Sequence, residues 1–280
     1  MAAAEGLRIS GVTVRFGGLT VLDGAGLTAP PATVTGLVGP DGAGKTILCD
    51  VIAGTRRPAA GTVRLGDADL TGSTARERAR RGIARTSQSS GREGSVTVRD
   101  SVRAAAAKHA MTRRYPGRTA RDRWRLRMDA RRDAGARADE LLARVGIEEH
   151  AGRCARTAPP GVARLLEVAR ALAAEPAVLL LDEPWSGLPV PDARALEVLL
   201  RDLAADGPAV LVAERELERV LGVCDVLHVL DGGRVIAAGP PAEVRADARV
   251  RDACPADAAV TMCRSSGGGP RAAARTRTPW

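Results

Sequence analysis

The sequence predicts an α/β protein with a largely parallel sheet, on three observations. Short apolar runs alternate with helical patterns between residues 177 and 221, in the rhythm of βαβ units. The run 177–181 is continuously apolar, which fits a central strand buried on both faces. The β-prone run 33–38 leads into a glycine-rich loop and then a helical segment, so a strand–loop–helix unit is expected there. Because only 2% of the 280 residues are aromatic, the core must be built from Val, Leu, Ile and Ala.

The expected elements follow in order along the chain. Strands are predicted at 7–16, 21–28, 33–38, 61–65 and 83–88, before a helical region over 98–145. Within that region, 113–137 is crowded with Arg and Asp and is expected to be a solvated helix face or loop. Helices at 161–174, 191–204 and 216–221 flank strands at 177–181 and 209–213, and a hairpin is expected over 225–237. The Ala/Gly/Arg/Pro-rich chain from 255 onward predicts a disordered tail.

Charge and composition narrow the class of protein. The net charge of +9 comes mainly from arginine in the helical insert and the tail, without the interleaved aromatic residues of a single-strand binder, so no nucleic-acid partner is expected. No apolar run approaches the roughly 18 residues of a membrane span, and the N-terminus lacks a signal-peptide pattern. Five scattered cysteines form no C-x-x-C pair. These features favour a reduced, cytoplasmic protein.

A glycine-rich loop carries the main functional signal. Its pattern, Gly-x4-Gly-Lys-Thr, places backbone N–H groups around nucleotide phosphates at a helix N-terminus. Lys45 is expected to reach the β- and γ-phosphates, the Thr46 hydroxyl to ligate Mg²⁺, and Ile47 to continue the binding segment. The chain has two lysines and otherwise uses arginine, which argues that this position needs a lysine. The loop reads Gly39-Pro40-Asp41-Gly42-Ala43-Gly44-Lys45-Thr46.

An acidic pair is the second signal. Asp182 and Glu183 follow the apolar run 177–181, and the carboxyl end of a parallel strand is where such a sheet presents ligands. Asp182 is expected to hold Mg²⁺ through water, and Glu183 to polarise the water that attacks the γ-phosphate. Together with the loop, the pair predicts an ATP site with Mg²⁺.

These motifs resemble the ATP-binding subunits of ABC transporters, most closely those of branched-chain amino-acid importers. The resemblance runs from about Leu7 to Arg251. Residues 15–19 are similar to the family's adenine-stacking loop, 82–88 to the strand that ends in its glutamine loop, 166–172 to the second half of its signature helix, and 229–244 to its closing hairpin and helix.

The resemblance implies a fold and a set of residue roles. The fold is a P-loop NTPase (RecA-like) core with an antiparallel β subdomain and an inserted α-helical subdomain at about 89–157, in a domain spanning 1–251 that a disordered tail, 252–280, follows. Phe16 is expected to stack on adenine. Gln88 is expected to contact both Mg²⁺ and the attacking water, and Glu183 to act as the base.

Two departures from the family pattern bear on activity. The signature loop, Leu-Ser-Gly-Gly-Gln in the family, falls on Ala158-Pro159-Pro160-Gly161-Val162, and proline supplies neither a hydroxyl nor an N–H. Arg215 stands at the position of the switch histidine and cannot relay a proton near neutral pH. Residues 89–94 are also polar where these importers carry apolar residues near the membrane subunit.

Three functions therefore remain open. One is an importer ATPase with reduced activity at the inner face of the cell membrane, paired with a second ABC ATPase subunit and permease subunits, and serving a substrate-binding protein indirectly. Another is a catalytically impaired regulatory or structural partner of an active ABC ATPase. The third, a soluble ABC ATPase acting on nucleic acid or ribosomes, has less support because the chain holds one nucleotide domain.

Overall fold

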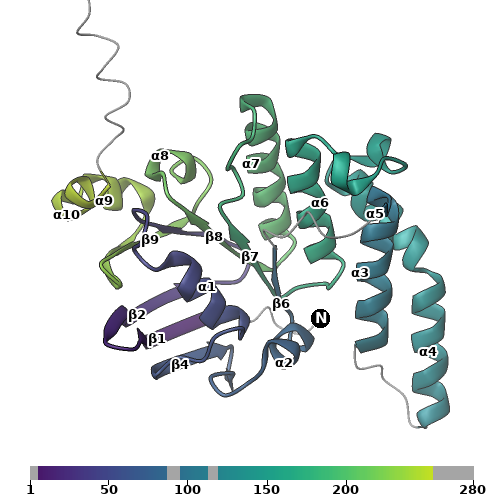
Figure 1. Ribbon diagram of the computed structural model, residues 1–280, viewed down its shortest axis with the longest axis horizontal. Helices are drawn as coiled ribbons and strands as arrows, with labels where there is room; N and C mark the ends of the chain where they lie inside the picture. Colours follow the sequence, from purple (N-terminus) through teal and green to yellow (C-terminus); the bar gives the residue numbers. More distant parts are fainter. Residues whose placement is uncertain (1–5, 87–94, 113–118, 255–280) are drawn as a thin grey trace, which may run out of the picture.

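A computed structural model describes residues 6–86, 95–112 and 119–254, which form two sheets and two groups of helices (Figure 1). The smaller sheet is antiparallel, with the order β2-β1-β4-β5. It lies on the N-terminal side of the molecule, as predicted for the antiparallel subdomain. Its strands are β1 (Leu7–Phe16), β2 (Leu19–Ala29), β4 (Ala60–Leu65) and β5 (Ala68–Asp69).

The larger sheet has six strands in the order β10-β9-β3-β8-β7-β6. All neighbours pair in parallel except β9 and β10, which form the predicted hairpin. This arrangement confirms the α/β class. The strands are β3 (Val34–Val38), β6 (Ile83–Arg85), β7 (Val178–Asp182), β8 (Ala209–Glu214), β9 (Val226–Asp231) and β10 (Arg234–Gly239). Of the strand expected over 83–88, β6 is observed as far as Arg85 at the edge of the sheet, and the N–H of Thr86 still donates to Leu180 of β7; residues 87 and 88 lie outside the described residues.

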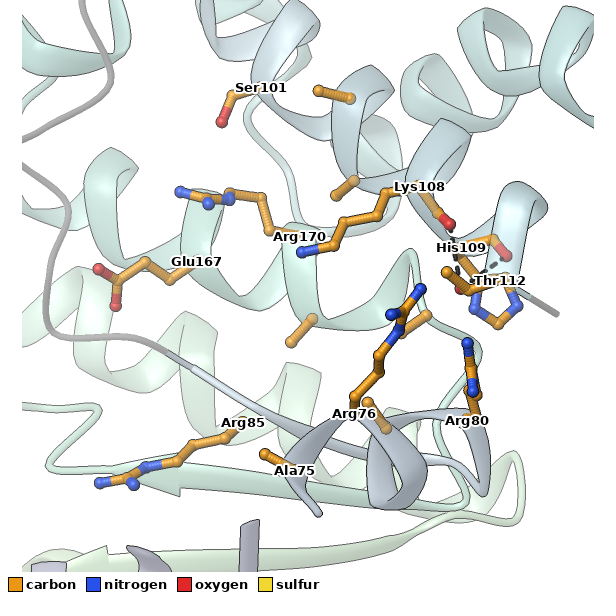
Figure 2. A pocket seen from close by; sticks show the side chains of 15 residues that line it. Ala75, Arg76, Arg80, Arg85, Ser101, Lys108, His109, Thr112, Glu167 and Arg170 are labelled. Carbon is orange, nitrogen blue, oxygen red and sulfur yellow. Dashed lines mark hydrogen bonds between the residues drawn. The ribbon is translucent and has the colours of Figure 1, made fainter. Parts of the chain in front are cut away.

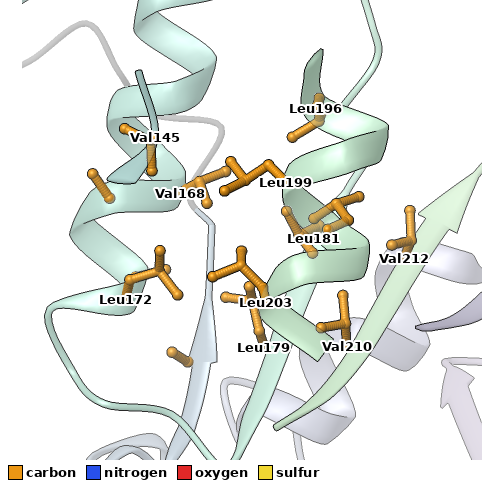
Figure 3. Packing of buried hydrophobic residues seen from close by; sticks show 14 of the residues in the cluster. Val145, Val168, Leu172, Leu179, Leu181, Leu196, Leu199, Leu203, Val210 and Val212 are labelled. Carbon is orange, nitrogen blue, oxygen red and sulfur yellow. The ribbon is translucent and has the colours of Figure 1, made fainter. Parts of the chain in front are cut away.

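The core has two parts, one on each face of this sheet. Helix α1 (Lys45–Ala53) buries Leu48, Val51 and Ile52 between the two sheets, where Leu180 of β7 also packs. Leu179 and Leu181 point to the opposite face, because side chains alternate along a strand. Figure 3 shows them packed against Leu199 and Leu203 of α7 (Val190–Ala205) and Val168 and Leu172 of α6 (Pro160–Leu172). The β7 run is therefore apolar throughout because both of its faces are covered.

A helical subdomain extends from one edge of the sheet (Figure 1). Helix α4 buries none of its residues, so this part of the Arg/Asp-rich segment 113–137 is a solvated helix, as predicted; residues 113–118 lie outside the described residues. Helix α5 packs against α3 and α6 and joins the main core through Leu141 and Leu142. The elements are α3 (Val98–Thr112), α4 (Ala120–Arg132), α5 (Ala134–Arg144) and two 3₁₀ turns, η1 (Glu148–His150) and η2 (Ala155–Thr157).

The C-terminal part continues slightly beyond the predicted domain boundary at residue 251. Helix α10 runs to Ala253 and buries Val250, which is fully covered in the core. The tail prediction therefore now concerns 255–280, which lie outside the described residues. Of the helices that the structure describes, none is long and apolar enough to cross a membrane. The remaining helices are α2 (Ala75–Arg80), α8 (Leu217–Val220), α9 (Pro241–Ala246) and α10 (Ala248–Ala253).

Candidate nucleotide-binding site

The predicted phosphate loop connects β3 to α1, and two of its glycines are sterically required. A Cβ at Gly39 would lie 2.0 Å from the carbonyl oxygen of Leu230 on β9. Gly44, the N-cap of α1, has φ 105°, which side-chain-bearing residues rarely adopt, and a Cβ there would meet Leu22 at 2.7 Å. The loop is thus held tightly against β9 and β2 while its end opens onto the free amides of the α1 N-terminus. Such amides bind anions.

Lys45 is the first residue of α1 and lies inside this loop. Its side chain is buried, and its ammonium donates hydrogen bonds to the carbonyls of Gly39 at 2.7 Å and Pro40 at 3.0 Å. Among the described residues this buried cation has neutral carbonyls as its partners and no anionic one, which a nucleotide phosphate can supply. Thr46 follows on the exposed side of the helix and Ile47 is half-buried. The loop therefore brings the predicted phosphate-binding residues together.

Asp182 ends β7 and is 2% exposed. Arg85, the last residue of β6, donates to Oδ2 of Asp182 at 3.0 Å and to Oδ1 of Asp50 on α1 at 2.5 Å. The Oδ1 atom of Asp182 is buried and has no hydrogen-bond partner among the described residues. Burial raises the pKa of the neighbouring Cys49 thiol to about 12, so this cysteine remains protonated and unreactive. One oxygen of Asp182 is thus held and the other is available to a ligand.

Mg²⁺ fits this donor set only together with a nucleotide. Among the described residues, no group of three or more His, Cys, Asp or Glu side chains could hold a metal ion. Mg²⁺ is commonly bound through one or two carboxylates together with substrate phosphates and water. The unpartnered Oδ1 of Asp182 and the exposed Thr46 are the donors that the described chain offers.

Glu183 lies in a strained turn directly after β7. Its φ of 48° is in the left-handed region, and its N–H donates to the carbonyl of Ala213 on β8 at 2.8 Å. Buried Glu214 ties the same turn to the next strand, accepting hydrogen bonds from the N–H groups of Trp185 and Arg215. Burial raises the pKa of Glu214, against these two hydrogen bonds that lower it. Strain held by neighbouring strands is typical of a residue that needs a fixed orientation.

Phe16, the predicted adenine-stacking residue, ends β1 with 42% of its surface exposed. The Arg56 guanidinium lies 4.3 Å from the centroid of its ring. Arg56 follows α1 along the chain, so this cation–π contact links the antiparallel sheet to the loop after the phosphate-binding helix. Arg56 thus covers one face of the Phe16 ring, and part of the Phe16 side chain remains exposed to solvent.

The signature segment begins α6 and differs from the family pattern in its chemistry. Pro159 is the N-cap and Pro160 the first helical residue, a position where proline is well tolerated because its missing N–H has no partner in a helix. Gly161 is buried, and a Cβ there would lie 2.1 Å from Oδ2 of Asp192 on α7. The two prolines therefore suit the fold, while a carboxylate lies beside the one remaining candidate donor.

Arg215 directly follows β8, and its guanidinium pairs with Oδ2 of Asp41 in the phosphate loop at 2.9 Å. Both side chains are exposed, by 57% and 68%, so the pair is weak by itself. It nevertheless places the switch position within reach of the phosphate loop across the site.

Three contributing residues were not found from the sequence, namely Arg85, Glu214 and Asp192. Their roles depend on contacts with residues far along the chain, and no local motif marks an arginine in a chain this rich in arginine. Gln88, the predicted glutamine-loop residue, lies outside the described residues.

Comparisons with known proteins agree with this geometry. The family model described as "ABC transporter" matches residues 22–186, more than half of the chain, and a model for branched-chain amino acid ATP-binding cassette transporters matches 234–254. The high-affinity branched-chain amino acid transport ATP-binding protein LivG of Escherichia coli K12 is 32% identical over 85% of this chain and 93% of its own length. BraF of Pseudomonas aeruginosa is 31% identical with the same coverage.

Solved structures of this kind also superpose on the chain. A nucleotide-free ATP-binding cassette from an ABC transporter gives a TM-score of 0.74 at 26% identity, covering 88% of this chain and 97% of its own. The ADP conformation of the cassette MJ1267 gives 0.74 at 26% identity, covering 89% and 97%. The chain therefore belongs to the ATP-binding subunits of ABC transporters, as its phosphate loop and acidic pair predicted.

Proposed function

We propose that this chain couples the binding and hydrolysis of Mg-ATP to import across a membrane, with branched-chain amino acids as the transported class. The proposal is carried by the phosphate loop, in which buried Lys45 donates to two backbone carbonyls beside the N-terminus of α1. Similarity to LivG and BraF, and the match over 234–254, support the transported class. The chain then acts as a peripheral protein on the cytoplasmic face of the membrane.

The residue roles follow from position. Lys45 and the loop 39–46 would hold phosphates, Phe16 would stack on adenine, and Thr46 and Asp182 would hold the metal, which would supply positive charge to the phosphoryl group. Glu183, in its fixed turn, takes the proton of the attacking water. The role of Gln88 beside the metal remains a prediction.

A groove between the core and the helical subdomain is the surface that we assign to the permease. It has a volume of about 780 Å³, with an apolar lining of alanines from α2, α3 and α6. Figure 2 shows Arg76 and Arg80 rising from α2 toward the helix that carries Lys108, and all three side chains are exposed. Small apolar side chains bordered by cations suit a helical segment with small residues and acidic side chains.

A second candidate function is that of an impaired partner to an active ABC ATPase. Specific observations favour it: Pro159 and Pro160 offer no N–H, and Asp192 places a carboxylate beside Gly161. The start of α6 therefore offers few hydrogen-bond donors to a nucleotide held by another subunit. We infer that the chain works with a second ATPase subunit whose own signature is intact.

The two lysines of the chain give a matched test of nucleotide binding. We expect Lys45→Ala to weaken Mg-ATP binding in calorimetric titration on the order of 100-fold, because it removes a charge-assisted phosphate contact. Lys108→Ala, which removes an exposed lysine in the groove, should leave this affinity unchanged and weaken assembly with the permease. Equal ATP affinity in the wild type and Lys45→Ala contradicts the proposed site.

A further inference from the structure

We propose that Arg85 is a positioning residue for the metal site, which fixes the carboxylate of Asp182 so that its Oδ1 atom faces the divalent cation of Mg-ATP. The inference rests on the proposed function, since it assumes that nucleotide and metal bind together at the phosphate loop. It assigns to Arg85 a role that acts through Asp182 and not through contact with the nucleotide.

Arg85 joins three elements of the site through one side chain. It extends from the end of β6 and donates to Asp50 on α1 at 2.5 Å and to Asp182 on β7 at 3.0 Å. Asp50 lies one and a half turns after Lys45 on the phosphate-binding helix. The guanidinium therefore sets the position of the metal carboxylate relative to the helix that holds the phosphates.

The contact with Arg85 makes the two carboxylate oxygens of Asp182 differ in their hydrogen bonding. Oδ2 accepts a hydrogen bond from Arg85, while Oδ1 is buried and has no partner within residues 6–86, 95–112 and 119–254. Buried polar atoms without a hydrogen-bond partner are uncommon and need an explanation. A metal ion or a metal-bound water at Oδ1 supplies that partner, and the planar guanidinium fixes which oxygen is offered.

A general structural role does not account for the contacts of Arg85. Arg78 is buried, whereas Arg85 is half-buried, and within the described part of the chain Arg78 donates to backbone carbonyls alone, those of Val51, Ile52, Thr71 and Ser73. Arg85 donates instead to two carboxylates. Figure 2 shows its guanidinium directed away from Arg76, Arg80 and Lys108, so it is separate from the basic side of the groove. Arg78 and Arg85 thus form a natural control pair.

The test measures how much Mg²⁺ strengthens ATP binding. The dissociation constant of ATP is measured by calorimetry with excess Mg²⁺ and again with EDTA, and the ratio of the two values is the Mg²⁺ advantage. Outer contacts to metal ligands typically change metal affinity 10- to 100-fold. We therefore expect Arg85→Met to reduce the advantage by about tenfold, with ATP affinity in EDTA little changed.

Two milder variants and one control complete the experiment. Arg85→Lys keeps a cation that can reach one carboxylate, and Asp50→Asn loosens the anchor of Arg85, so both should reduce the advantage by about two- to fivefold. Arg78→Lys should lower the melting temperature and leave the advantage at its wild-type value.

The outcomes separate this inference from the proposed function. If the wild type binds ATP more tightly with Mg²⁺, and Arg85→Met and Arg85→Lys keep the full advantage, the positioning role is overturned. If Arg85→Met does not fold, Arg85→Lys and Asp50→Asn decide the question, and an unchanged advantage in both overturns the role. If the wild type binds no ATP with or without Mg²⁺, the proposed function itself fails.

Discussion

Two regions of the molecule differ in how closely they follow the family pattern. One is the phosphate-loop side, made of the loop 39–46 with Asp182 and Glu183, and the other is the signature side, made of residues 158–162 at the start of α6. On the phosphate-loop side, Lys45 is buried and Asp182 is held by Arg85, and the one predicted departure from the family pattern is Arg215, which pairs with the exposed Asp41. On the signature side, Pro159 and Pro160 are exposed and offer no N–H. The site for this chain's own nucleotide is therefore expected to lack only the switch histidine, whereas the segment that would contact a nucleotide held by another subunit is expected to lack most of its donors.

The difference shows that a residue at the first turn of α6 can suit the fold and still be unsuited to phosphate binding. Proline at the first turn of α6 satisfies the helix, because that N–H has no intrahelical partner. The same N–H groups are the ones that a phosphate at the helix N-terminus would need. The substitution is therefore compatible with the fold and incompatible with the family's phosphate contact.

The largest effect that we expect from this asymmetry is on turnover. A homodimer would combine each phosphate loop with a facing segment 158–162 and with Arg215. Losing a proton-handling residue typically reduces rates about 10² to 10⁴-fold, and losing one oxyanion donor about 10² to 10³-fold. The losses need not multiply, since both act on one transition state. Steady-state ATP hydrolysis by the purified chain should therefore be far slower than that of an intact relative, with Glu183→Gln as the baseline.

Repair variants sharpen this prediction. With an intact partner subunit, the site built on Lys45 and Glu183 lacks only the switch histidine, so Arg215→His should raise activity. In the lone chain the same change should do little until Pro159 and Pro160 are also replaced. Family-typical turnover by the unmodified lone chain contradicts the asymmetry and indicates an ordinary active ATPase.

The next effect is on stability and concerns the phosphate-loop side. Arg78 is 1% exposed and donates to four carbonyls, including those of Val51 and Ile52 in the last turn of α1. Arg78→Met leaves these buried acceptors unpaired, and we expect it to lower the free energy of unfolding by about 3 kcal/mol. Urea denaturation measures the change.

The signature side provides the contrast for this measurement. Pro160→Gly removes a favourable but exposed first-turn residue, so it should change the free energy of unfolding by less than about 1 kcal/mol. Similar losses for Arg78→Met and Pro160→Gly would show that stability is not concentrated around α1.

How much of the fold and of the nucleotide site can be predicted from the sequence depends on how far apart the interacting residues lie along the chain. The loop 39–46 and the pair Asp182 and Glu183 are contiguous motifs, and the structure places them at the carboxyl ends of β3 and β7, two parallel strands with β8 between them. Arg85 instead contacts Asp50 and Asp182, which lie 35 and 97 residues away along the chain, so no local sequence pattern predicts these contacts. The strand order, with β3 between β8 and β9, likewise arises from long-range pairing.

The ends of elements and of the domain are also difficult to predict from the sequence. The strand predicted over 83–88 is observed as far as Arg85, and residues 87 and 88 lie outside the described part of the chain. The domain end predicted at residue 251 is where the family resemblance ends; α10 continues to Ala253, but it has one strongly buried side chain, Val250, and no clear apolar period that would mark it in the sequence.

A smaller effect concerns the ion pair between the phosphate loop and Arg215. Exposed ion pairs contribute up to about 1 kcal/mol, so Asp41 and Arg215 should show weak coupling in a double-mutant cycle. Asp41→Asn removes a negative charge near the phosphates and releases Arg215, and we expect ATP affinity to rise by roughly two- to fivefold. In an Arg215→Ala background the gain should be smaller, and high salt should reduce both effects. Equal gains in both backgrounds show that Arg215 does not respond to Asp41.

The smallest effect is expected at the C-terminus, where two truncations differ by one short helix. Removing 255–280 deletes a segment with almost no apolar cluster to bury, so thermal stability and ATP affinity should stay at wild-type values. Removing 248–280 also deletes α10 and exposes the core around Val250, which is 0% exposed. Losing a buried valine typically costs about 1.5 to 3 kcal/mol, so the second truncation should melt measurably earlier. A large drop in melting temperature on removing 255–280 alone contradicts the tail prediction, since only docking of that segment on the core could cause it.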